Sequence, residues 1–270
     1  MKSLGVWTGR IFGWAMICAL IVRAEDPREE LGRLAARYQS AASWTCSVLV
    51  RSTLTAEGPG QQSFVRYALA FRKPDRFLAR RIDGMPGVDF LFEKERIRIF
   101  SPSAHQFADR LEPAALAHLM RDQTEPAVVL FMNSVPFVYT LLTSDPLAHW
   151  LEGVTVGQMD ARNDEGKVQL TFRQEAFDWT LLAKTGDDAR ILALAVDMGK
   201  TVRANHPESE ATWMIQIEFS DWTFNTDPPD SVFALEVPES AIRISYSNLL
   251  KTPTDAPMPR PPAPPDEKAD

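Results

Sequence analysis

The sequence predicts an α+β fold of mostly antiparallel strands, in which one strongly curved sheet forms an incomplete β-barrel and helices plug its concave face. Two observations carry this prediction. Runs of alternating apolar and polar residues occur in both halves of the chain, and short charged connections join several of them, which is typical of antiparallel hairpins. Between the two halves lie apolar stretches that begin at prolines, which is typical of helices.

The N-terminal residues predict export. Lys2 and Arg10 precede an apolar run over residues 11–22, and Val22-Arg23-Ala24 resembles a signal-peptidase site. This run is shorter than the roughly 20 residues that a membrane-spanning helix needs. We therefore expect residues 1–24 to be a signal peptide that directs export of the protein. An uncleaved membrane anchor is the alternative.

Removal of this segment takes away three positive charges and lowers the formal net charge from −7 to −10. Such an acidic chain argues against a nucleic acid or an anionic lipid surface as a partner held by charge. Cys46 is then the only cysteine left, which excludes an intramolecular disulfide. Because Cys46 alternates with Trp44, Val48 and Val50, we expect its thiol to lie in the core.

The folded domain is expected over residues 26–247. It begins with an amphipathic helix, because Asp26 can cap it, Pro27 suits its first turn and apolar residues follow at helical spacing: Leu31, Leu34, Ala35 and Tyr38. From Lys251 onward prolines dominate the sequence. Such a segment cannot bury a core, so residues 248–270 are expected to be a disordered tail.

Six strands are expected in the first half, over residues 44–54, 62–73, 76–82, 88–93, 96–100 and 106–111. In the second of these, Val65, Tyr67, Leu69 and Phe71 alternate with polar neighbours, which predicts a sheet with one buried face. Five more are expected in the second half, over residues 154–161, 167–174, 177–184, 190–200 and 210–224.

Helices are expected between these two groups of strands. Pro113 and Pro126 can each begin one, and Ser144 or Asp145 can cap a third that starts at Pro146. Residues 127–142 carry no charge, but sixteen residues that include Pro136 are too few and too irregular to span a membrane. We expect these helices to pack against the sheet.

Four phrases, taken in order, resemble a known family. They are Phe71-Arg72-Lys73-Pro74-Asp75-Arg76-Phe77, then Ser144-Asp145-Pro146 leading to Leu151-Glu152-Gly153-Val154-Thr155, then Phe172-Arg173-Gln174 with Asp178-Trp179, and finally Asp221-Trp222-Thr223-Phe224-Asn225. In this combination the chain resembles the predicted periplasmic proteins called domain of unknown function 2092, from Leu31 to Ile244. That family is similar in turn to the LolA-like lipoprotein-carrier superfamily.

The resemblance implies a LolA-like half barrel whose concave apolar face accepts acyl chains of lipoproteins in transit. The chain departs from its family at one point. Members often carry a Cys-x-His pair just before the strand that includes Leu170, where this sequence has Lys167-Val168-Gln169. A thiol or metal role for that pair does not carry over.

Metal and catalytic motifs are absent from the sequence. His105, His118, His149 and His206 lie on different expected elements without the paired spacing of a zinc site. The chain has no Gly-x-Ser-x-Gly elbow, His-Glu-x-x-His helix or glycine-rich phosphate loop. We therefore expect a protein that is not an enzyme and needs neither a metal nor a cofactor.

The candidate ligand-binding residues are apolar and come from two strands and the middle helices. They are Val65, Tyr67, Leu69, Phe71, Leu130, Phe131, Phe137, Tyr139, Trp213, Ile215, Ile217 and Phe219. The alternative is that they form an ordinary core between sheet and helices, since a core uses the same side chains as a pocket. The basic stretch from Arg72 to Arg81 is expected to be a solvated strand face, or else to dock an acidic partner or lipid headgroup.

Two functions follow as hypotheses. The first is a periplasmic, non-enzymatic protein that binds a lipid or lipoprotein acyl chain, or another elongated hydrophobic ligand, and hands it between membranes. The second is an interaction or structural module of the envelope whose half barrel is permanently filled. In that case the proline-rich tail or the Arg72 to Arg81 face would engage a protein partner.

Overall fold

The computed structural model describes residues 27–246 and 248, except 56–59, 86, 112–113, 122–124, 153, 155–158, 165 and 176. The expected signal peptide, residues 1–24, lies outside the described residues, and so does the expected tail apart from Asn248. Within the described ranges, no helix combines the length and the apolar character needed to cross a membrane.

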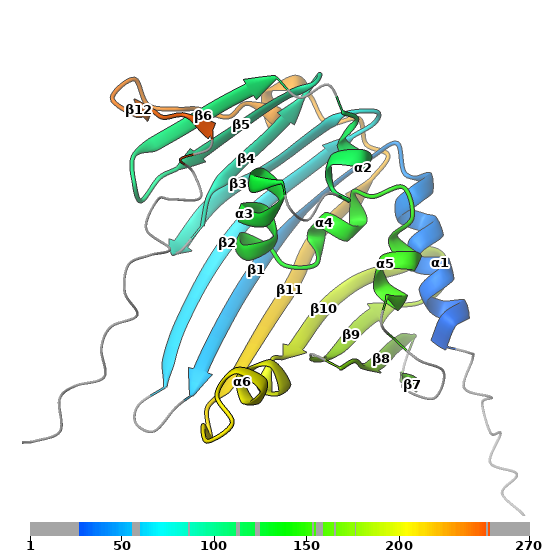
Figure 1. The fold of residues 1–270 in the computed structure, drawn as a ribbon. Coiled ribbons are helices and arrows are strands. Elements are labelled where there is room, and N and C mark those ends of the chain that lie inside the picture. Colours follow the sequence, from blue (N-terminus) through cyan, green and yellow to red (C-terminus); the bar gives the residue numbers. More distant parts are fainter. Residues whose placement is uncertain are drawn as a thin grey trace, which may run out of the picture.

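The predicted fold class is confirmed: the described chain is built around one large, curved, unclosed and mostly antiparallel sheet (Figure 1). Its twelve strands are β1 (Ser43–Thr55), β2 (Gln61–Arg72), β3 (Arg76–Met85), β4 (Asp89–Glu93), β5 (Arg96–Ser101), β6 (Gln106–Leu111), β7 (Met159–Asp164), β8 (Lys167–Arg173), β9 (Asp178–Lys184), β10 (Arg190–Asp197), β11 (Thr212–Phe224) and β12 (Ile242–Arg243). Their order across the sheet is β12-β6-β5-β4-β3-β2-β1-β11-β10-β9-β8-β7. All neighbours are antiparallel except β12 and β6.

The sheet consists of two meanders, the first with β1 to β6 and the second with β7 to β11, which meet where β1 pairs with β11. β1 pairs with β2 on one side and with β11 on the other. Val48 lies opposite Phe219, and Val50 lies opposite Ile217. Because side chains alternate along a strand, this register puts the apolar residues of β1 and β11 on the same, concave face.

Six α-helices and two short 3-10 helices complete the described structure. They are α1 (Pro27–Ser40), α2 (Leu116–Leu119), α3 (Pro126–Ser134), α4 (Val138–Leu141), α5 (Pro146–Leu151), α6 (Gly199–Asn205), η1 (Gly186–Asp188) and η2 (Asp230–Phe233). Helices α2 to α5 cross the concave side of the sheet (Figure 1). Asp145 caps α5 as predicted, since its carboxylate accepts a hydrogen bond of 3.1 Å from the backbone N–H of Ala148.

Helix α1 packs against the second meander and bonds to it. The buried ring of Tyr38 packs against Trp222 at a centroid distance of 5.4 Å, and its hydroxyl accepts a hydrogen bond of 3.1 Å from the backbone N–H of Ile191 in β10. Burial raises the pKa of the Tyr38 hydroxyl, so it stays protonated. The helix therefore contributes both an apolar face and a polar anchor to the sheet.

Helices α2 to α5, here called the plug, fill the concave face over the first meander (Figure 1). Phe131 of α3 stacks on Phe90 at 5.4 Å and meets the edge of Phe77 at 5.2 Å. All three rings are buried. Cys46 is buried in the same core, as predicted, and burial raises the pKa of its thiol. The thiol is therefore held in its unreactive, protonated form.

A second core lies on the opposite face of the first meander. Ala70, Leu78, Leu91 and Phe100 point away from the main core but are buried beneath Phe233 and Leu235, which follow β11. This segment covers the outer side of β2 to β5. Simple alternation predicts one buried face of the sheet, so this second buried layer was not predicted.

The packing of this C-terminal segment shows that the prediction of a solvated basic stretch is wrong for Arg72 and Arg76. Arg72 and Arg76 are not a solvated face, because their guanidinium groups lie over the ring of Phe233 at 5.2 Å and 4.7 Å. Both also form ion pairs with Asp230, at 2.6 Å in the case of Arg72. Arg76 also pairs with Glu93 of β4 at 2.6 Å, so the acidic partners of these arginines belong to the chain itself.

Three expected strands differ from the structure by three residues or more. The strand expected over residues 76–82 is β3, which continues to Met85. The strand expected over residues 154–161 is β7, which begins only at Met159. The strand expected over residues 190–200 ends at Asp197, whose carboxylate accepts a hydrogen bond of 2.8 Å from the backbone N–H of Gly199 at the start of α6. Local hydrogen bonding of this kind offers the backbone an alternative to the ladder of the sheet.

We predict that the substitution Phe233→Ala lowers the free energy of unfolding by about 3 kcal/mol, because it empties the second core and removes the ring beneath Arg72 and Arg76. Urea denaturation measures this change. The matched control is Phe64→Ala, whose ring is exposed and whose loss should change stability by less than about 0.5 kcal/mol. Equal effects of the two substitutions would show that the C-terminal segment does not stabilise the sheet.

A second prediction concerns acid stability. Burial alone would raise the pKa of Asp109, but hydrogen bonds from Arg96 (2.6 and 2.7 Å) and Arg98 (3.1 Å) bring this pKa below its usual value. Asp109 therefore stabilises the fold fully above its unfolded-state pKa of about 4, and this contribution is lost as the pH falls further.

The measurement is the free energy of unfolding of the wild type and of Asp109→Asn from about pH 6 to pH 3. We expect the wild type to be more stable at pH 6 and the difference to shrink below about pH 4. A difference that stays constant over this range would contradict the prediction.

Candidate functional site

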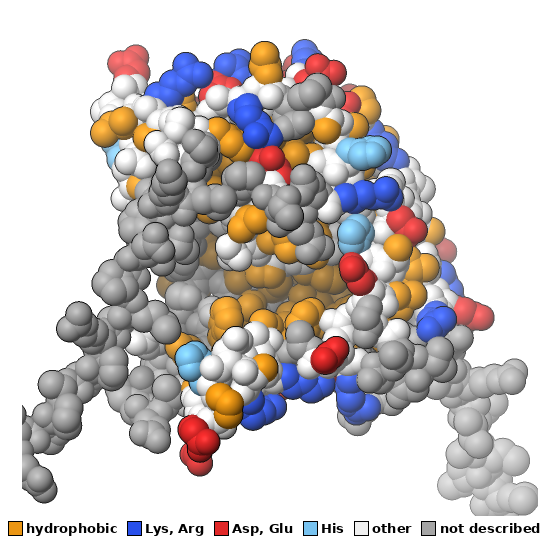
Figure 2. All heavy atoms as spheres, in the orientation of Figure 1, with side chains coloured by type: hydrophobic (Ala, Val, Ile, Leu, Met, Phe, Trp, Pro, Cys, Tyr) orange, Lys and Arg blue, Asp and Glu red, His pale blue; other side chains and the backbone are white. Residues whose placement is uncertain are grey.

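The most ligand-like feature of the described structure is an apolar cleft of about 370 Å³. It lies between the plug helices and the strands β9 to β11. Figure 2 shows it as a recess with hydrophobic side chains on its walls, above α6. The lining residues are Met132, Asn133, Pro136, Phe137, Tyr139, Thr140, His149, Trp150, Gln174, Phe177, Trp179, Leu194, Val196, Met198, Trp213 and Ile215.

Aromatic rings dominate the wall that the helices provide. Phe137 stacks on Trp150 with 15° between the ring planes and a centroid distance of 5.5 Å, and it touches Trp179 at 5.9 Å. Trp179 in turn stacks on Phe172 at 3.9 Å. These contacts join the turn between α3 and α4 to α5, β9 and β8, so the wall is a continuous packed unit.

Hydrogen bonds hold the indole rings of Trp150 and Trp213 in place. The indole N–H of Trp150 donates to Thr140 Oγ1 at 2.8 Å, and Thr140 Oγ1 donates to the carbonyl of Phe137 at 2.6 Å. On the sheet side, the indole N–H of Trp213 donates to Ser52 Oγ at 2.8 Å. A pocket whose rings are already held in place loses little freedom when a ligand binds.

Phe137 has a backbone conformation that is rare for a bulky residue, with φ of 72°. Such a conformation costs on the order of 1–3 kcal/mol, and residues that adopt it cluster at functional sites. Here Phe137 directly precedes α4, and its ring lies against Trp150. The strained residue therefore lies between α3 and α4, in the wall of the cleft that the helices form.

Charged side chains are absent from the lining that the structure describes. The nearby ammonium of Lys200 is occupied by the carboxylate of Asp178 at 2.6 Å and the carbonyl of Gln174 at 2.8 Å. Burial, and secondarily Glu152, raise the pKa of Tyr139, which keeps its hydroxyl neutral. The cleft is thus suited to an uncharged, apolar group.

The structure brings four of the predicted ligand-binding residues together in this cleft: Phe137, Tyr139, Trp213 and Ile215. Leu130 is half-buried against the core. The remaining seven are buried in the main core, namely Val65, Tyr67, Leu69, Phe71, Phe131, Ile217 and Phe219. Six of them lie on the buried face of β2 or β11, and Phe131 belongs to α3, so these side chains form the core between sheet and helices.

Sequence reasoning missed most of the cleft's lining, including Trp150, Phe177 and Trp179. Trp179 alternates with Leu181 and Ala183 on the buried face of β9, a pattern that the sequence does show. Trp150 sits at the end of a short capped helix, and nothing in the local sequence indicates which space its ring enters. Only the packing of α5 against the sheet does so.

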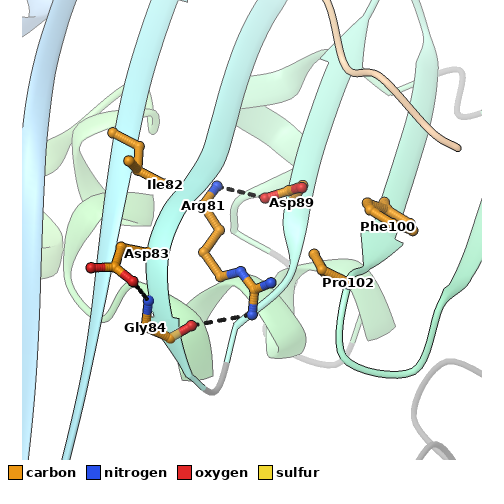
Figure 3. A pocket seen from close by; sticks show the side chains of 7 residues that line it. All are labelled: Arg81, Ile82, Asp83, Gly84, Asp89, Phe100 and Pro102. Atoms are coloured by element: carbon orange, nitrogen blue, oxygen red, sulfur yellow. Dashed lines mark hydrogen bonds between the residues drawn. The ribbon is translucent and has the colours of Figure 1, made fainter.

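A second, polar pocket lies at the end of β3 and is lined by Arg81, Ile82, Asp83, Gly84, Asp89, Phe100 and Pro102 (Figure 3). The backbone N–H of Arg81 donates to the Asp89 carboxylate at 2.5 Å, and the Arg81 guanidinium donates to the carbonyl of Gly84 at 3.2 Å. Burial raises the pKa of Asp89. Because its charged residues bond to the surrounding chain, this pocket is less suited to a ligand than the apolar cleft.

Among the described residues, no group of three or more His, Cys, Asp or Glu side chains is placed to hold a metal ion. The four histidines lie on separate elements, with His149 at the cleft and His105 bonded to Ser240 at 2.8 Å.

Comparison with solved structures gives matches of low identity. The chain is similar to an uncharacterized conserved protein from Thermus thermophilus, with 10% identity, a TM-score of 0.42, and coverage of 81% of this chain and 98% of that chain. It is also similar to the Mycobacterium tuberculosis lipoprotein LppX, with 13% identity, a TM-score of 0.34, and coverage of 78% and 98%. A LolA superfamily protein from Nitrosomonas europaea matches with 12% identity, a TM-score of 0.33, and coverage of 77% and 97%.

No curated protein matches the chain. The sequence profile of the family described as "Predicted periplasmic protein (DUF2092)" matches residues 31–246, which is most of the chain. The protein therefore belongs to the DUF2092 family of predicted periplasmic proteins.

Proposed function

We propose that this protein is exported to the periplasm and binds one hydrophobic ligand in the apolar cleft, without catalysing a reaction. The observation that carries this proposal is the cleft itself, which holds about 370 Å³ beside the packed core of the half barrel. Small-molecule sites in proteins commonly measure about 300–1,000 Å³ and are mostly apolar with a few polar groups. Asn133 and Gln174 supply such groups here.

The cellular location rests on two independent observations. Residues 1–24 have the charge, apolar run and cleavage signal of a signal peptide. The family profile that covers residues 31–246 describes predicted periplasmic proteins. An exported protein meets membranes on both sides of its compartment, where apolar ligands that need a carrier are found.

The ligand class follows from the lining. An acyl chain, or another elongated apolar molecule, gains roughly 0.8 kcal/mol for each methylene group that leaves water. The recess opens to the surface in Figure 2, so a ligand can enter without unfolding of the sheet. A carrier that passes such a ligand between membranes is the role that the family resemblance implies.

The lining also supports a function without catalysis. Within the described residues it offers no Ser, Cys, Lys, Asp or Glu side chain, and the rings of Tyr139 and His149, which do belong to it, pack edge to face against each other. The hydroxyl of Thr140 is engaged between Trp150 and Phe137. Catalysis by a nucleophile or a general acid and base requires such groups to be free and positioned at the substrate.

The alternative function, an envelope interaction module, is favoured by one observation. The concave face over the first meander is filled by the plug, with Phe131 packed between Phe77 and Phe90. A partner that recognises the basic face would have to displace Asp230 from Arg72 and Arg76. We therefore place such a partner, in this alternative, at the proline-rich tail.

The experiment is native mass spectrometry, with lipid extraction, of the protein purified from its own periplasm without detergent. We expect a chain that begins at Glu25 and carries one hydrophobic molecule. The variant Ile215→Arg places a charge in the cleft and should lose this ligand. The matched control Ile82→Arg, at an exposed position of β3, should retain it.

Two outcomes would contradict the proposal. A ligand that remains bound to Ile215→Arg would place the binding site elsewhere. A ligand-free mass that does not change after incubation with fatty acids and lipopeptides would favour the envelope interaction module.

A further inference from the structure

We infer that the cleft selects a neutral, planar ring compound with a hydrogen-bonding oxygen over a flexible alkyl chain of the same carbon number. This inference rests on the proposed function, because it assumes that the cleft binds a hydrophobic ligand. Among the apolar ligands of that function it ranks ring compounds above acyl chains, on three grounds: the rings of the lining, the rigidity of those rings, and the size and polarity of the space.

The first ground is the number of rings that face the space. Five ring-bearing residues of the lining keep part of their surface accessible: Phe137, Tyr139, His149, Phe177 and Trp213. They come from the helical plug, the connection before β9, and β11, so rings stand on both sides of the cleft. Aromatic rings attract each other in offset-stacked and edge-to-face arrangements beyond what buried area alone provides. A ring compound gains these contacts, whereas an alkyl chain does not.

The second ground is that these rings cannot easily move aside. Phe137 is backed by the buried indoles of Trp150 and Trp179. Tyr139 meets His149 edge to face at 6.2 Å, and Trp213 is held by its hydrogen bond to Ser52. A flexible chain must adapt to fixed walls and loses rotational freedom when it does so, whereas a planar ring enters with its shape already set.

The third ground is the size and polarity of the space. A volume of about 370 Å³ is near the lower end of the range for ligand pockets, so it suits one compact molecule. Asn133 offers an amide donor and acceptor, and Gln174 offers its amide oxygen, since its amide nitrogen donates to the carbonyl of Glu152 at 2.5 Å. No Asp, Glu, Lys or Arg belongs to the described lining. The occupant is therefore uncharged where it is buried and carries an oxygen that these amides can bond.

The test uses two probes with ten carbons and one hydroxyl group each, 1-naphthol and 1-decanol, titrated by calorimetry into the mature chain freed of lipid. Decanol is the more hydrophobic of the two, so transfer from water alone would favour it. We expect naphthol to bind at least about threefold more tightly, because ring contacts and the saved rotational freedom outweigh that advantage.

Two variants test whether the rings cause this preference. Trp213→Leu and Phe177→Leu each remove one ring from the lining but keep an apolar side chain. Each should reduce the preference for naphthol by about threefold and leave decanol affinity nearly unchanged. The matched control, Phe64→Leu, removes an exposed ring of β2 and should keep the wild-type preference. Circular dichroism and thermal unfolding establish that each variant is folded.

The outcomes separate this inference from the proposed function. Tighter binding of naphthol, lost in either cleft variant that folds, supports the inference. Equal or tighter binding of decanol, or a naphthol preference that both cleft variants retain, overturns the inference and leaves hydrophobic-ligand binding intact. Absence of binding for both probes overturns the inference and the proposed function together.

Discussion

The antiparallel pairing of β1 with β11 is the constraint on which the rest of the structure depends. It joins residues that lie far apart in the chain, such as Val48 and Phe219, and turns two separate meanders into one sheet. The apolar faces of both strands then lie on the same side, where the plug packs. Closing such long-range contacts costs chain entropy that only the packed plug and sheet together can offset.

The plug covers the two meanders unequally, and the cleft results from this difference. Over the first meander, Phe131 fills the space between Phe77 and Phe90 completely. Over the second, the corresponding space is bounded by rings, since Phe137 and Trp150 lie on one side and Trp213 on the other. Interiors are normally packed without large voids, so a space of this size beside a dense core is a specific property of the site.

Local signals made most of the fold predictable. The hairpins and the cap at Asp145 depend on neighbours in sequence, and the boundaries of β6 were predicted correctly at both ends. The layer formed by Phe233 and the end of β10 at Asp197 depend on distant packing or on a short turn, and alternation alone does not indicate them. At the candidate site, the alternation of side chains along a strand shows which face of the sheet a residue lies on but not how deeply it is buried. Tyr67 and Trp213 therefore looked equivalent, although the first is buried and the second lines the cleft.

The turn at Phe137 links the stability of the plug to the shape of the cleft. If the apolar segment after Pro126 formed one continuous helix, its side chains would cover the sheet as a single ridge. Instead, α3 ends at Ser134 and α4 begins at Val138, and Phe137 lies between them with a left-handed backbone. Its cost is offset by the stacking on Trp150 and by the hydrogen bond from Thr140 to its carbonyl. The contacts that stabilise the turn are therefore the same contacts that hold the wall of the cleft.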